Sequence, residues 1–260
     1  MSHHAFGVDI GGSGIKGAPV DLRTGELTSD RYRIETPQPA TPSAVGATVA
    51  KVISHFSLKP HTPVGVTFPG VVQQGVVRTA ANLDPSWIDV NLRGVIRTRA
   101  RRDVRAMNDA DAAGYAEYRY GAAEGKDGLV LLVTLGTGIG TALIADGRLV
   151  PNTELGHITI DGRDAEEYAA ESARDRHGLD TAAWAEHVNR YLQEMERLLW
   201  PDLIIIGGGV SKEFDDFGPL LDLRAPVVPA ALRNEAGIVG AAAQAAESAR
   251  IAKQHAAARE

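Results

Sequence analysis

The chain has 260 residues, no cysteine and a formal net charge of −6, with 44% hydrophobic and 23% charged residues. This composition is that of a folded globular protein with a sizeable core, and it excludes disulfide bonds, thiolate metal sites and a cysteine nucleophile. The acidic balance argues against nucleic acid and acidic membranes as partners. No apolar run reaches the ~18 residues of a membrane span and no secretory signal is visible, so we expect a cytoplasmic protein.

The first half of the chain alternates predicted strands and helices. A short apolar strand runs into a glycine turn, and two further strands rich in β-type residues follow it. Helical spacing of apolar residues predicts the first helix, and Asn108 or Asp109 is available to cap the last one. The predicted strands are 5–10, 15–20, 27–34, 64–68 and 104–107, and the predicted helices are 43–56, 90–101 and 110–120.

The same order of elements recurs in the second half. Residues 129–150 again form an apolar strand, a turn of glycines with a hydroxyl residue, a strand, a glycine turn and a strand. Helices are expected around 165–177 and 181–199, a strand over 203–206, and an alanine-rich helix from about residue 237. Strands that alternate with helices indicate an α/β protein, and the duplicated hairpin suggests two related lobes.

We place the boundary between the lobes after Asn108. Residues 1–108 form the expected small N-terminal lobe, and residues 109–260 form the expected large C-terminal lobe. The terminal helix, about residues 237–258, is expected either to pack back on the small lobe or to serve an interface. The sequence leaves a monomer and a homodimer both open.

Two glycine turns are candidate phosphate-binding loops. Residues 12–17 match G-x-G-x-x-G, but Pro19 and the turn at Thr24-Gly25 leave no room for the helix of a dinucleotide fold. A glycine turn lets main-chain N–H groups approach a phosphate, and Lys16 adds a positive charge. Two ordinary tight hairpins are the alternative, which the equivalent positions of the turns disfavour. A third glycine run, residues 207–209, ends a buried strand. Three glycines there would let the base or ribose of a nucleotide lie against the backbone, and the alternative is a strand-to-helix turn that needs one glycine with positive φ.

Six short motifs follow one another along nearly the whole chain. They are Asp9-Ile10-Gly11-Gly12-Ser13, Phe68-Pro69-Gly70, Asn108-Asp109-Ala110-Asp111-Ala112, Leu135-Gly136-Thr137-Gly138-Ile139-Gly140, Glu154-Leu155-Gly156-His157 and Ile206-Gly207-Gly208-Gly209. With these motifs in this order, the chain resembles the ROK family of sugar kinases, within the hexokinase/actin-like ATPase superfamily. The resemblance implies an α/β protein with the two-lobed actin-like ATPase (ribonuclease H-like) fold and an active site in the cleft between the lobes.

The chain departs from the family at one place. Most ROK kinases follow Glu-x-Gly-His with a cysteine-rich zinc element, whereas residues 158–166 here contain no cysteine. The resemblance therefore implies a kinase with no zinc, in which the loop near the sugar is held by other means. The missing zinc element and the sequence of the first glycine turn resemble the polyphosphate-using branch of the family.

The resemblance also assigns roles to two aspartates. Asp109 is the expected general base, which accepts the proton of a sugar hydroxyl as the phosphoryl group arrives. The alternative is that Asp109 merely caps the following helix. Asp9 is expected to hold Mg²⁺, through water, together with the phosphates of the donor, and a plain turn acid is its alternative.

The remaining expected site residues bind the sugar and the donor. For the family's sugar-binding glutamate, Glu167 is the alternative to Glu166, because the two positions are adjacent. For His157, the alternative to sugar binding is an ordinary histidine buried in the core. Sugar binding is implied for Gly70, Asn108, Asp109, Glu154, His157 and Glu166. Phosphate binding is implied for Gly11, Gly12, Ser13, Gly14, Lys16, Gly136, Thr137 and Gly138, and nucleotide binding for Gly207, Gly208 and Gly209.

A cluster of arginines precedes Asp109, with only Asp103 opposing their charge. The cluster comprises Arg93, Arg97, Arg99, Arg101, Arg102 and Arg105. A basic track of this kind would attract a polyanion, whereas a solvated helix face is the ordinary explanation of such a run.

Together these observations predict a kinase that transfers a phosphoryl group from inorganic polyphosphate or ATP to the 6-hydroxyl of glucose, with mannose as a further candidate acceptor. An ATP-only glucokinase of the same family is the first alternative. A sugar-sensing ROK repressor is disfavoured because the first strand begins by Ala5, before which a DNA-binding module does not fit. A non-catalytic sugar-binding protein is disfavoured by Asp109 and the two glycine turns.

Overall fold

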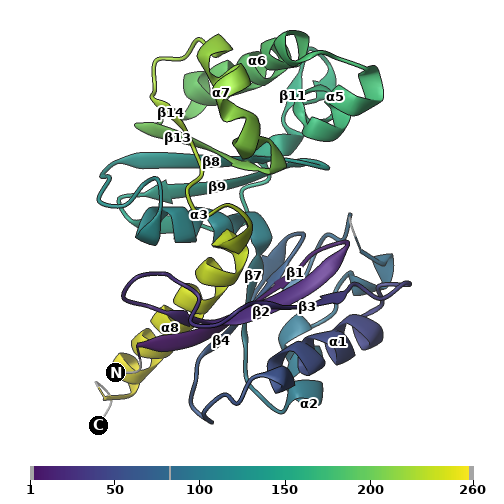
Figure 1. Ribbon diagram of the computed structural model, residues 1–260, viewed down its shortest axis with the longest axis vertical. Coiled ribbons are helices and arrows are strands. Elements are labelled where there is room, and N and C mark those ends of the chain that lie inside the picture. The colour runs from purple at the N-terminus through teal and green to yellow at the C-terminus, as the bar shows by residue number, and fades with distance from the viewer. Residues whose placement is uncertain (1–2, 82, 258–260) are drawn as a thin grey trace. The chain divides into compact units, whose positions relative to one another are not determined.

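The computed structural model describes residues 3–81 and 83–257 (Figure 1). The chain divides into two compact units, of which unit 1 comprises Met1–Ala116 with Glu235–Glu260 and unit 2 comprises Glu117–Asn234. Among the described residues, no helix is long and apolar enough to cross a membrane. Each unit is an open sheet with helices packed against it, as alternating strands and helices predict.

Unit 1 is built on a five-stranded sheet in the order β3-β2-β1-β4-β7. β1 pairs antiparallel with β2 and parallel with β4, and β4 pairs parallel with β7. Because β1, β4 and β7 run in the same direction, their carboxyl ends meet at one edge of the sheet. The strands are β1 (His4–Ile10), β2 (Gly14–Asp21), β3 (Tyr32–Glu35), β4 (Val64–Phe68) and β7 (Arg105–Asn108), with a small hairpin of β5 (Val72–Gln73) and β6 (Val76–Val77).

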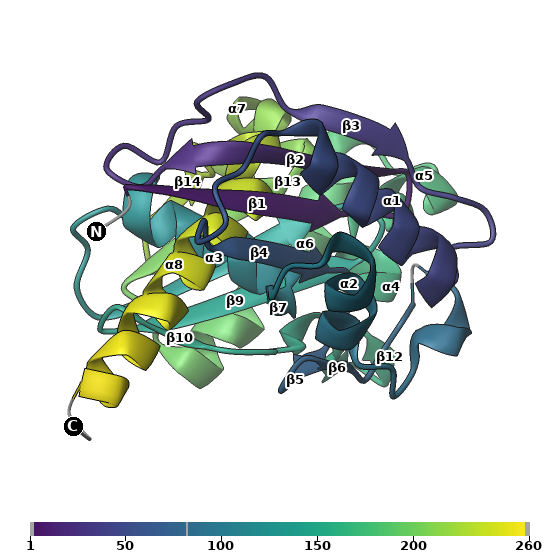
Figure 2. The same ribbon diagram turned by 90° about the horizontal axis from the view of Figure 1, so that it is seen from below.

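Helices cover both faces of the unit 1 sheet (Figures 1 and 2). α1 (Pro42–His55) and α2 (Leu92–Ala100) bury the core of one face, where Phe6 packs on Phe56 and Phe68 packs on Trp87. α8 (Ala236–Ala257) lies along β1 and β4 on the other face. A Cβ atom on Gly7 or Gly65 would overlap carbonyl oxygens of α8, so only glycine allows the helix backbone to lie this close.

Unit 2 repeats the strand order of unit 1. Its sheet runs β10-β9-β8-β13-β14, with β8 antiparallel to β9 and parallel to β13. The duplicated hairpin of the sequence is therefore a duplicated half-sheet, three antiparallel strands followed by two parallel crossovers. The strands are β8 (Leu129–Leu135), β9 (Ile139–Ala145), β10 (Arg148–Val150), β13 (Leu203–Gly208) and β14 (Val227–Pro229), and a separate hairpin consists of β11 (Thr159–Ile160) and β12 (Arg163–Asp164).

The core of unit 2 lies between the sheet and its longest helix. α6 (Thr181–Leu199) is capped by Asp180, whose carboxylate accepts a hydrogen bond from the Ala183 N–H at 2.8 Å. Its apolar face, which includes Trp184 and Leu192, packs on the alternating inward side chains of β8 and β13. The shorter helices are α4 (Glu166–Ala169), α5 (Glu171–His177) and α7 (Phe214–Phe217).

Three sequence predictions differ from the structure. The helix expected over 165–177 is two helices, because Ala170 between α4 and α5 has extended backbone with ψ 156°. The strand expected over 27–34 is reduced to β3, with Leu27 forming only an isolated bridge to Val20. The helix expected from residue 90 begins at Leu92, because the Asn91 side chain caps it by accepting a hydrogen bond from the Gly94 N–H.

The units also divide at a different place from the expected lobes. The chain leaves unit 1 at Ala116, inside α3 (Asp109–Tyr120), and not after Asn108. The first turns of α3 belong to unit 1 because they touch α8, where a Cβ on Gly240 would overlap the carbonyl group of Ala112. The terminal helix belongs to unit 1 as well, and residues 258–260 lie outside the described part of the chain.

Candidate active site

An acid–base pair lies at the end of β1 in unit 1. Asp9 stands opposite Lys16 across the β1–β2 hairpin, and the Lys16 Nζ lies 3.1 Å from the Asp9 Oδ2. The hydroxyl of Thr67 on β4 donates to the Asp9 Oδ1 at 2.7 Å and accepts from the Ile10 N–H at 3.1 Å. α8 closes on the same group, since a Cβ on Gly237 would lie 2.9 Å from the Asp9 carboxyl carbon. The carboxylate is therefore held by two strands and one helix, beyond what a turn acid requires.

The donor set around Asp9 is compatible with a magnesium ion. Mg²⁺ usually retains waters and takes one or two carboxylates plus phosphate oxygens. Among the described residues no group of three or more acidic or histidine side chains forms a metal cage. Asp9 supplies one carboxylate directly before the first glycine turn, paired with Lys16 at 3.1 Å, and a single carboxylate is compatible with a Mg²⁺ that keeps most of its waters.

The first glycine turn is closed by its own backbone and held by β3. The Gly11 N–H donates to the Gly14 carbonyl at 3.0 Å, and the Thr36 hydroxyl donates to the Gly11 carbonyl at 2.5 Å. Arg33 donates to the Ser13 carbonyl at 2.9 Å, and a Cβ on Gly14 would overlap the Arg33 guanidinium. The turn thus carries a second cation besides Lys16. Arg33 is not among the site residues expected from the sequence, because only the β2–β3 register places it opposite Lys16.

The second glycine turn, in unit 2, is also closed by its own backbone but is one residue shorter. The Gly136 N–H donates to the Gly138 carbonyl at 3.0 Å, two positions on, whereas Gly11 donates to Gly14, three positions on. Ser172 at the start of α5 holds the turn from outside, with its N–H on the Gly136 carbonyl at 3.0 Å and its hydroxyl on the Thr137 carbonyl at 2.6 Å. The two turns expected from the duplication therefore share closure by a backbone hydrogen bond but differ in length by one residue.

Asn108, and not Asp109, caps α3. The Asn108 Oδ1 accepts from the Asp111 N–H at 2.9 Å, and the Asn108 Nδ2 donates to the Gly70 carbonyl at 3.1 Å. Asp109 is the first residue of the helix, and its Oδ1 accepts from the adjacent Ala110 N–H at 2.9 Å. The side-chain cap of α3 is therefore supplied by Asn108, one of the two residues that the sequence left open for this role. The structure brings Gly70, Asn108 and Asp109 together at the edge where β4 and β7 end.

Three of the expected sugar-binding residues gather in unit 2. His157 ends a short 3-10 helix (Leu155–His157) that begins directly after Glu154, and Glu166 begins α4. The His157 Nδ1 lies 2.9 Å from the Asp164 Oδ2 and 4.0 Å from the Glu166 Oε1. The His157 side chain is 51% exposed, so it is not a buried core histidine.

Glu166 also touches the second glycine turn. Its Oε2 accepts from the Ile139 N–H at 3.1 Å, and a Cβ on Gly138 would overlap this carboxylate. Glu167 is exposed and none of the described contacts of its side chain reaches the turn. The geometry therefore favours Glu166 over Glu167.

The electrostatics of this group are coupled. The pKa of His157 is raised, first because its ring bonds the Asp164 carboxylate, and further by the charges of Glu166 and Glu154, while burial opposes the rise. The pKa of Glu154 is raised, mainly because its carboxyl group is desolvated. The group thus combines carboxylate oxygens, which accept hydrogen bonds, with an imidazole, which can accept and donate, and this combination suits recognition of several neighbouring hydroxyls.

The third glycine run ends β13. Gly208 has φ 83°, and a Cβ on it would overlap the Leu135 carbonyl, so a turn that needs glycine explains this position. Gly207 has no positive φ, but a Cβ on it would lie 3.1 Å from the Thr134 Cγ2, and a Cβ on Gly209 would lie 3.2 Å from the Glu171 Oε2. The turn alternative thus accounts for one of the three glycines.

Half of the arginine cluster serves the fold. Arg93 donates to the Val104 carbonyl and to Asp103 at 3.0 Å, and Arg99 donates to Ser43 at 2.9 Å. Arg102 donates to the carbonyls of Leu58 and Lys59 at 2.7 and 2.9 Å. These bonds tie α2 and the following turn to α1 and its exit loop, which weakens the case for a continuous polyphosphate track.

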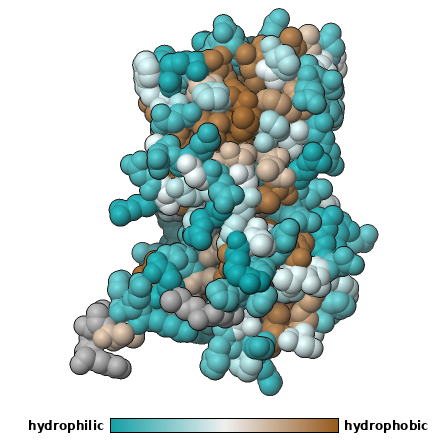
Figure 3. Space-filling view, turned by 60° about the vertical axis from the view of Figure 1, so that its left-hand side comes forward, coloured by the Kyte–Doolittle hydropathy of each residue, from teal (hydrophilic) through white to brown (hydrophobic). Residues whose placement is uncertain are grey.

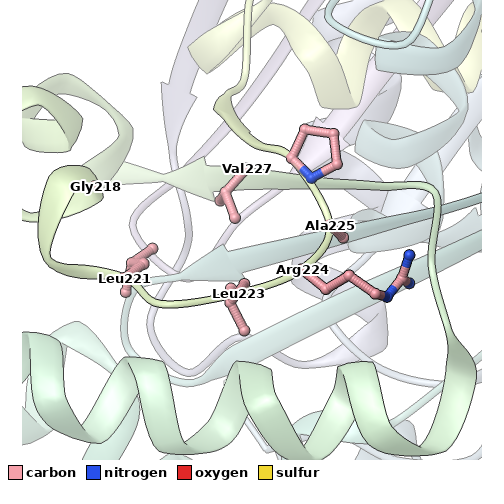
Figure 4. A pocket seen from close by; sticks show the side chains of 7 residues that line it. Gly218, Leu221, Leu223, Arg224, Ala225 and Val227 are labelled. Atoms are coloured by element: carbon pink, nitrogen blue, oxygen red, sulfur yellow. The ribbon is translucent and has the colours of Figure 1, made fainter.

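A pocket of unit 2 lies apart from all of these residues (Figure 4). It has a volume of about 380 Å³ and is lined by Gly218, Leu221, Leu223, Arg224, Ala225, Pro226 and Val227. The loop that forms it is fastened to α6, since Glu196 accepts from the Ala225 N–H at 2.7 Å and Asn189 accepts from the Asp222 N–H at 2.8 Å. None of the expected site residues lines the pocket. Separately from the pocket, Figure 3 shows hydrophobic side chains gathered on the surface near the top of the view.

Comparison with known proteins places the chain in a family. Residues 5–178 match the ROK family. The polyphosphate glucokinase of Mycobacterium tuberculosis (strain CDC 1551 / Oshkosh) is 55% identical over 240 residues, which cover 92% of this chain and 90% of that protein.

Solved structures agree with this match. The inorganic polyphosphate/ATP-glucomannokinase from Arthrobacter sp. strain KM is 52% identical with a TM-score of 0.89, covering 95% of this chain and 100% of that one. A ROK family glucokinase from Streptomyces griseus, solved with glucose and AMPPNP, is 26% identical with a TM-score of 0.80, covering 94% and 99%. The expected two-lobed actin-like ATPase fold is confirmed. The chain belongs to the ROK family.

Proposed function

We propose that the protein is a sugar kinase that transfers a phosphoryl group from inorganic polyphosphate or ATP to the 6-hydroxyl of glucose, and that it also accepts mannose. The observation that carries the proposal is the place of Asp109, which begins α3 at the edge where the parallel strands β4 and β7 of unit 1 end. The 55% identity with a polyphosphate glucokinase over 92% of the chain supports this donor and this acceptor.

In this proposal Asp109 is the general base. Phosphoryl transfer depends on positioning and charge neutralisation more than on covalent chemistry. The Asp109 carboxylate would accept the proton of the 6-hydroxyl as its oxygen attacks the terminal phosphorus, and the bond from that phosphorus to the remaining donor would break. Gly70 and Asn108, already joined by a hydrogen bond, would position the sugar beside it. Glu154, His157 and Glu166 would bind other sugar hydroxyls.

The two glycine turns would bind the donor phosphates. Their main-chain N–H groups and Lys16 supply positive charge and hydrogen-bond donors. Asp9 would hold Mg²⁺ through water. When bound, Mg²⁺ would neutralise charge on the phosphates during transfer. For ATP, residues 207–209 would lie against the nucleoside, where Gly208 and Gly209 are exposed and carry no side chain.

A donor panel tests the proposal. Purified protein is given glucose with ATP, or with long-chain polyphosphate, at matched Mg²⁺, and glucose 6-phosphate is measured. We expect product from both donors, and from mannose as acceptor in a parallel series. Product from ATP alone would remove polyphosphate from the proposal and leave an ATP-only sugar kinase. No product from any donor would contradict the kinase itself.

Arg33 gives a prediction about the donor. Its guanidinium lies on the first glycine turn through the Ser13 carbonyl, where it would face a phosphate. We expect Arg33→Ala to raise the KM for polyphosphate roughly tenfold, because a hydrogen bond from a charged donor is lost. The KM for glucose should hardly change.

Arg31→Ala is the matched control, because it removes the same charge from an exposed position two residues away. Steady-state kinetics with each substrate varied in turn measure the effect. If the KM for polyphosphate rises equally in both variants, Arg33 acts only through the general positive charge of the surface and does not contact a phosphate.

We further propose a cytoplasmic location. The support is the absence of cysteine from the sequence, since a chain without disulfide bonds is suited to a reducing compartment.

A further inference from the structure

Asp164 bonds two of the expected sugar-binding residues at once. Its Oδ2 lies 2.9 Å from the His157 Nδ1, and its Oδ1 accepts from the Glu166 N–H at 3.1 Å. His157 and Glu166 lie nine residues apart in the chain, and Asp164 is the side chain that joins them. No motif of the sequence pointed to this residue.

The hairpin that carries Asp164 occupies the stretch where the chain has no zinc element. β11 and β12 pair Thr159 with Asp164 and Ile160 with Arg163. Ile160 is only 5% exposed and belongs to the core of unit 2, so the hairpin is anchored to the body of the unit. The Ala165 N–H donates to the Ile158 carbonyl at 3.0 Å and closes the hairpin directly before α4. A short anchored hairpin therefore supports the residues that surround it.

We propose that Asp164 is the positioning residue of the sugar site. One oxygen of its carboxylate fixes the ring orientation and the tautomer of His157, and the other oxygen fixes the start of α4, which carries Glu166. The inference rests on the proposed function, because it assumes that His157 and Glu166 bind the sugar. Residues 158–166 contain no cysteine, and in this stretch a carboxylate on a hairpin connects the two residues.

The chemistry follows from the bond to Nδ1. A carboxylate can only accept, so the neutral imidazole carries its proton on Nδ1 and presents the lone pair of Nε2 to a sugar hydroxyl. The charged groups around the ring are all carboxylates, namely Asp164, Glu166 and Glu154, and they raise the pKa of His157. An amide at position 164 could instead donate to Nδ1, which would move the proton to Nε2 and replace the acceptor by a donor.

The test is Asp164→Asn, compared with Asp161→Asn. Asp161 lies in the turn of the same hairpin, has φ 51°, which asparagine tolerates, and pairs with Arg190 and not with His157. In Asp164→Asn we expect the KM for glucose to rise roughly tenfold while kcat at saturating glucose and the KM for the donor change little. Asp161→Asn should behave as the unchanged protein.

A second measurement is independent of phosphoryl transfer. In the unchanged protein, ¹⁵N NMR of the histidines should show a raised pKa for His157 and, at pH values above that pKa, a neutral ring with its proton on Nδ1. Asp164→Asn should move this proton to Nε2 and lower the pKa of His157. Failure of the proposed function would remove the kinetic effect and leave the NMR result standing. The inference is overturned if His157 shows the same tautomer and titration in both variants and in the unchanged protein.

Thermal melting separates positioning from folding. We expect Asp164→Asn to melt close to Asp161→Asn and to bind glucose more weakly in calorimetry. If Asp164→Asn does not fold, Asp164→Glu keeps the carboxylate and should retain the Nδ1 proton. Loss of glucose binding in Asp164→Glu with an unchanged His157 tautomer would contradict the inference.

Discussion

The Asp109→Asn variant is expected to lose glucose phosphorylation by a factor of about 10²–10⁴ in kcat while its affinity for glucose is nearly kept. Asparagine has the same shape, and its Oδ1 can still accept from the Ala110 N–H, as the Asp109 Oδ1 does at 2.9 Å. It cannot take up the proton of the sugar hydroxyl. The helix should remain intact because its cap is Asn108. Coupled-enzyme kinetics and glucose calorimetry measure the two effects.

The control for this variant is Asp127→Asn, which removes an exposed acid beyond the end of α3. It should leave both kcat and glucose affinity unchanged. An Asp109→Asn protein that turns over at nearly the full rate would show that another group accepts the proton. A variant that loses glucose binding to the same degree as turnover would indicate a binding residue and not a base.

The Glu117→Ala variant should be strongly destabilised. The Glu117 side chain is fully buried, and its oxygens accept from the N–H groups of Ala122, Ala231 and Leu232 at 2.8, 3.1 and 2.7 Å. The three bonds are partly buried and have a charged acceptor, and each such bond contributes about 1.5–3 kcal/mol, so a loss of roughly 3 kcal/mol or more is expected. At about 2–4 °C per kcal/mol for a chain of this size, the melting temperature should fall by roughly 10 °C.

Two further variants interpret the result. Glu124→Ala removes an exposed glutamate from the same stretch, and its melting temperature should stay within about 2 °C of the unchanged protein. Glu117→Gln keeps the volume but turns one acceptor into a donor that faces backbone N–H groups, so an intermediate loss is expected. If Glu117→Ala has the same melting temperature as the Glu124→Ala control, water replaces the carboxylate as the acceptor without loss of stability, which contradicts the prediction.

Several features of the fold and site could be predicted because they depend on short stretches of sequence. Each glycine turn is a local hairpin, and its recurrence at 129–150 predicted a second sheet in the same strand order. The motif Asn108-Asp109 could be placed at a strand-to-helix junction from apolar periodicity alone. The ROK family and the two-lobed fold followed from the order of such motifs.

Other features could not be predicted, because they depend on contacts between distant segments. Whether Asn108 or Asp109 caps α3 is decided by the Gly70 carbonyl, which lies 38 positions earlier in the chain. Gly7 and Gly65 look like ordinary strand residues until α8 lies against them. The sequence left a basic track and a solvated helix face both open for the arginines before Asp109, and neither predicts that Arg93 and Arg102 bind backbone carbonyls.

The sequence by itself determined the α/β class, the duplicated half-sheets, the glycine turns and the position of Asp109 at a strand-to-helix junction. These features follow from periodicity and turn chemistry, which act over a few residues. Only the tertiary structure decided that Glu117 binds backbone N–H groups from a segment more than a hundred residues away and that Asp164 joins His157 to Glu166. The physical reason is that a buried or bridging polar side chain is stabilised by the partners it meets, and these partners are set by how the elements pack.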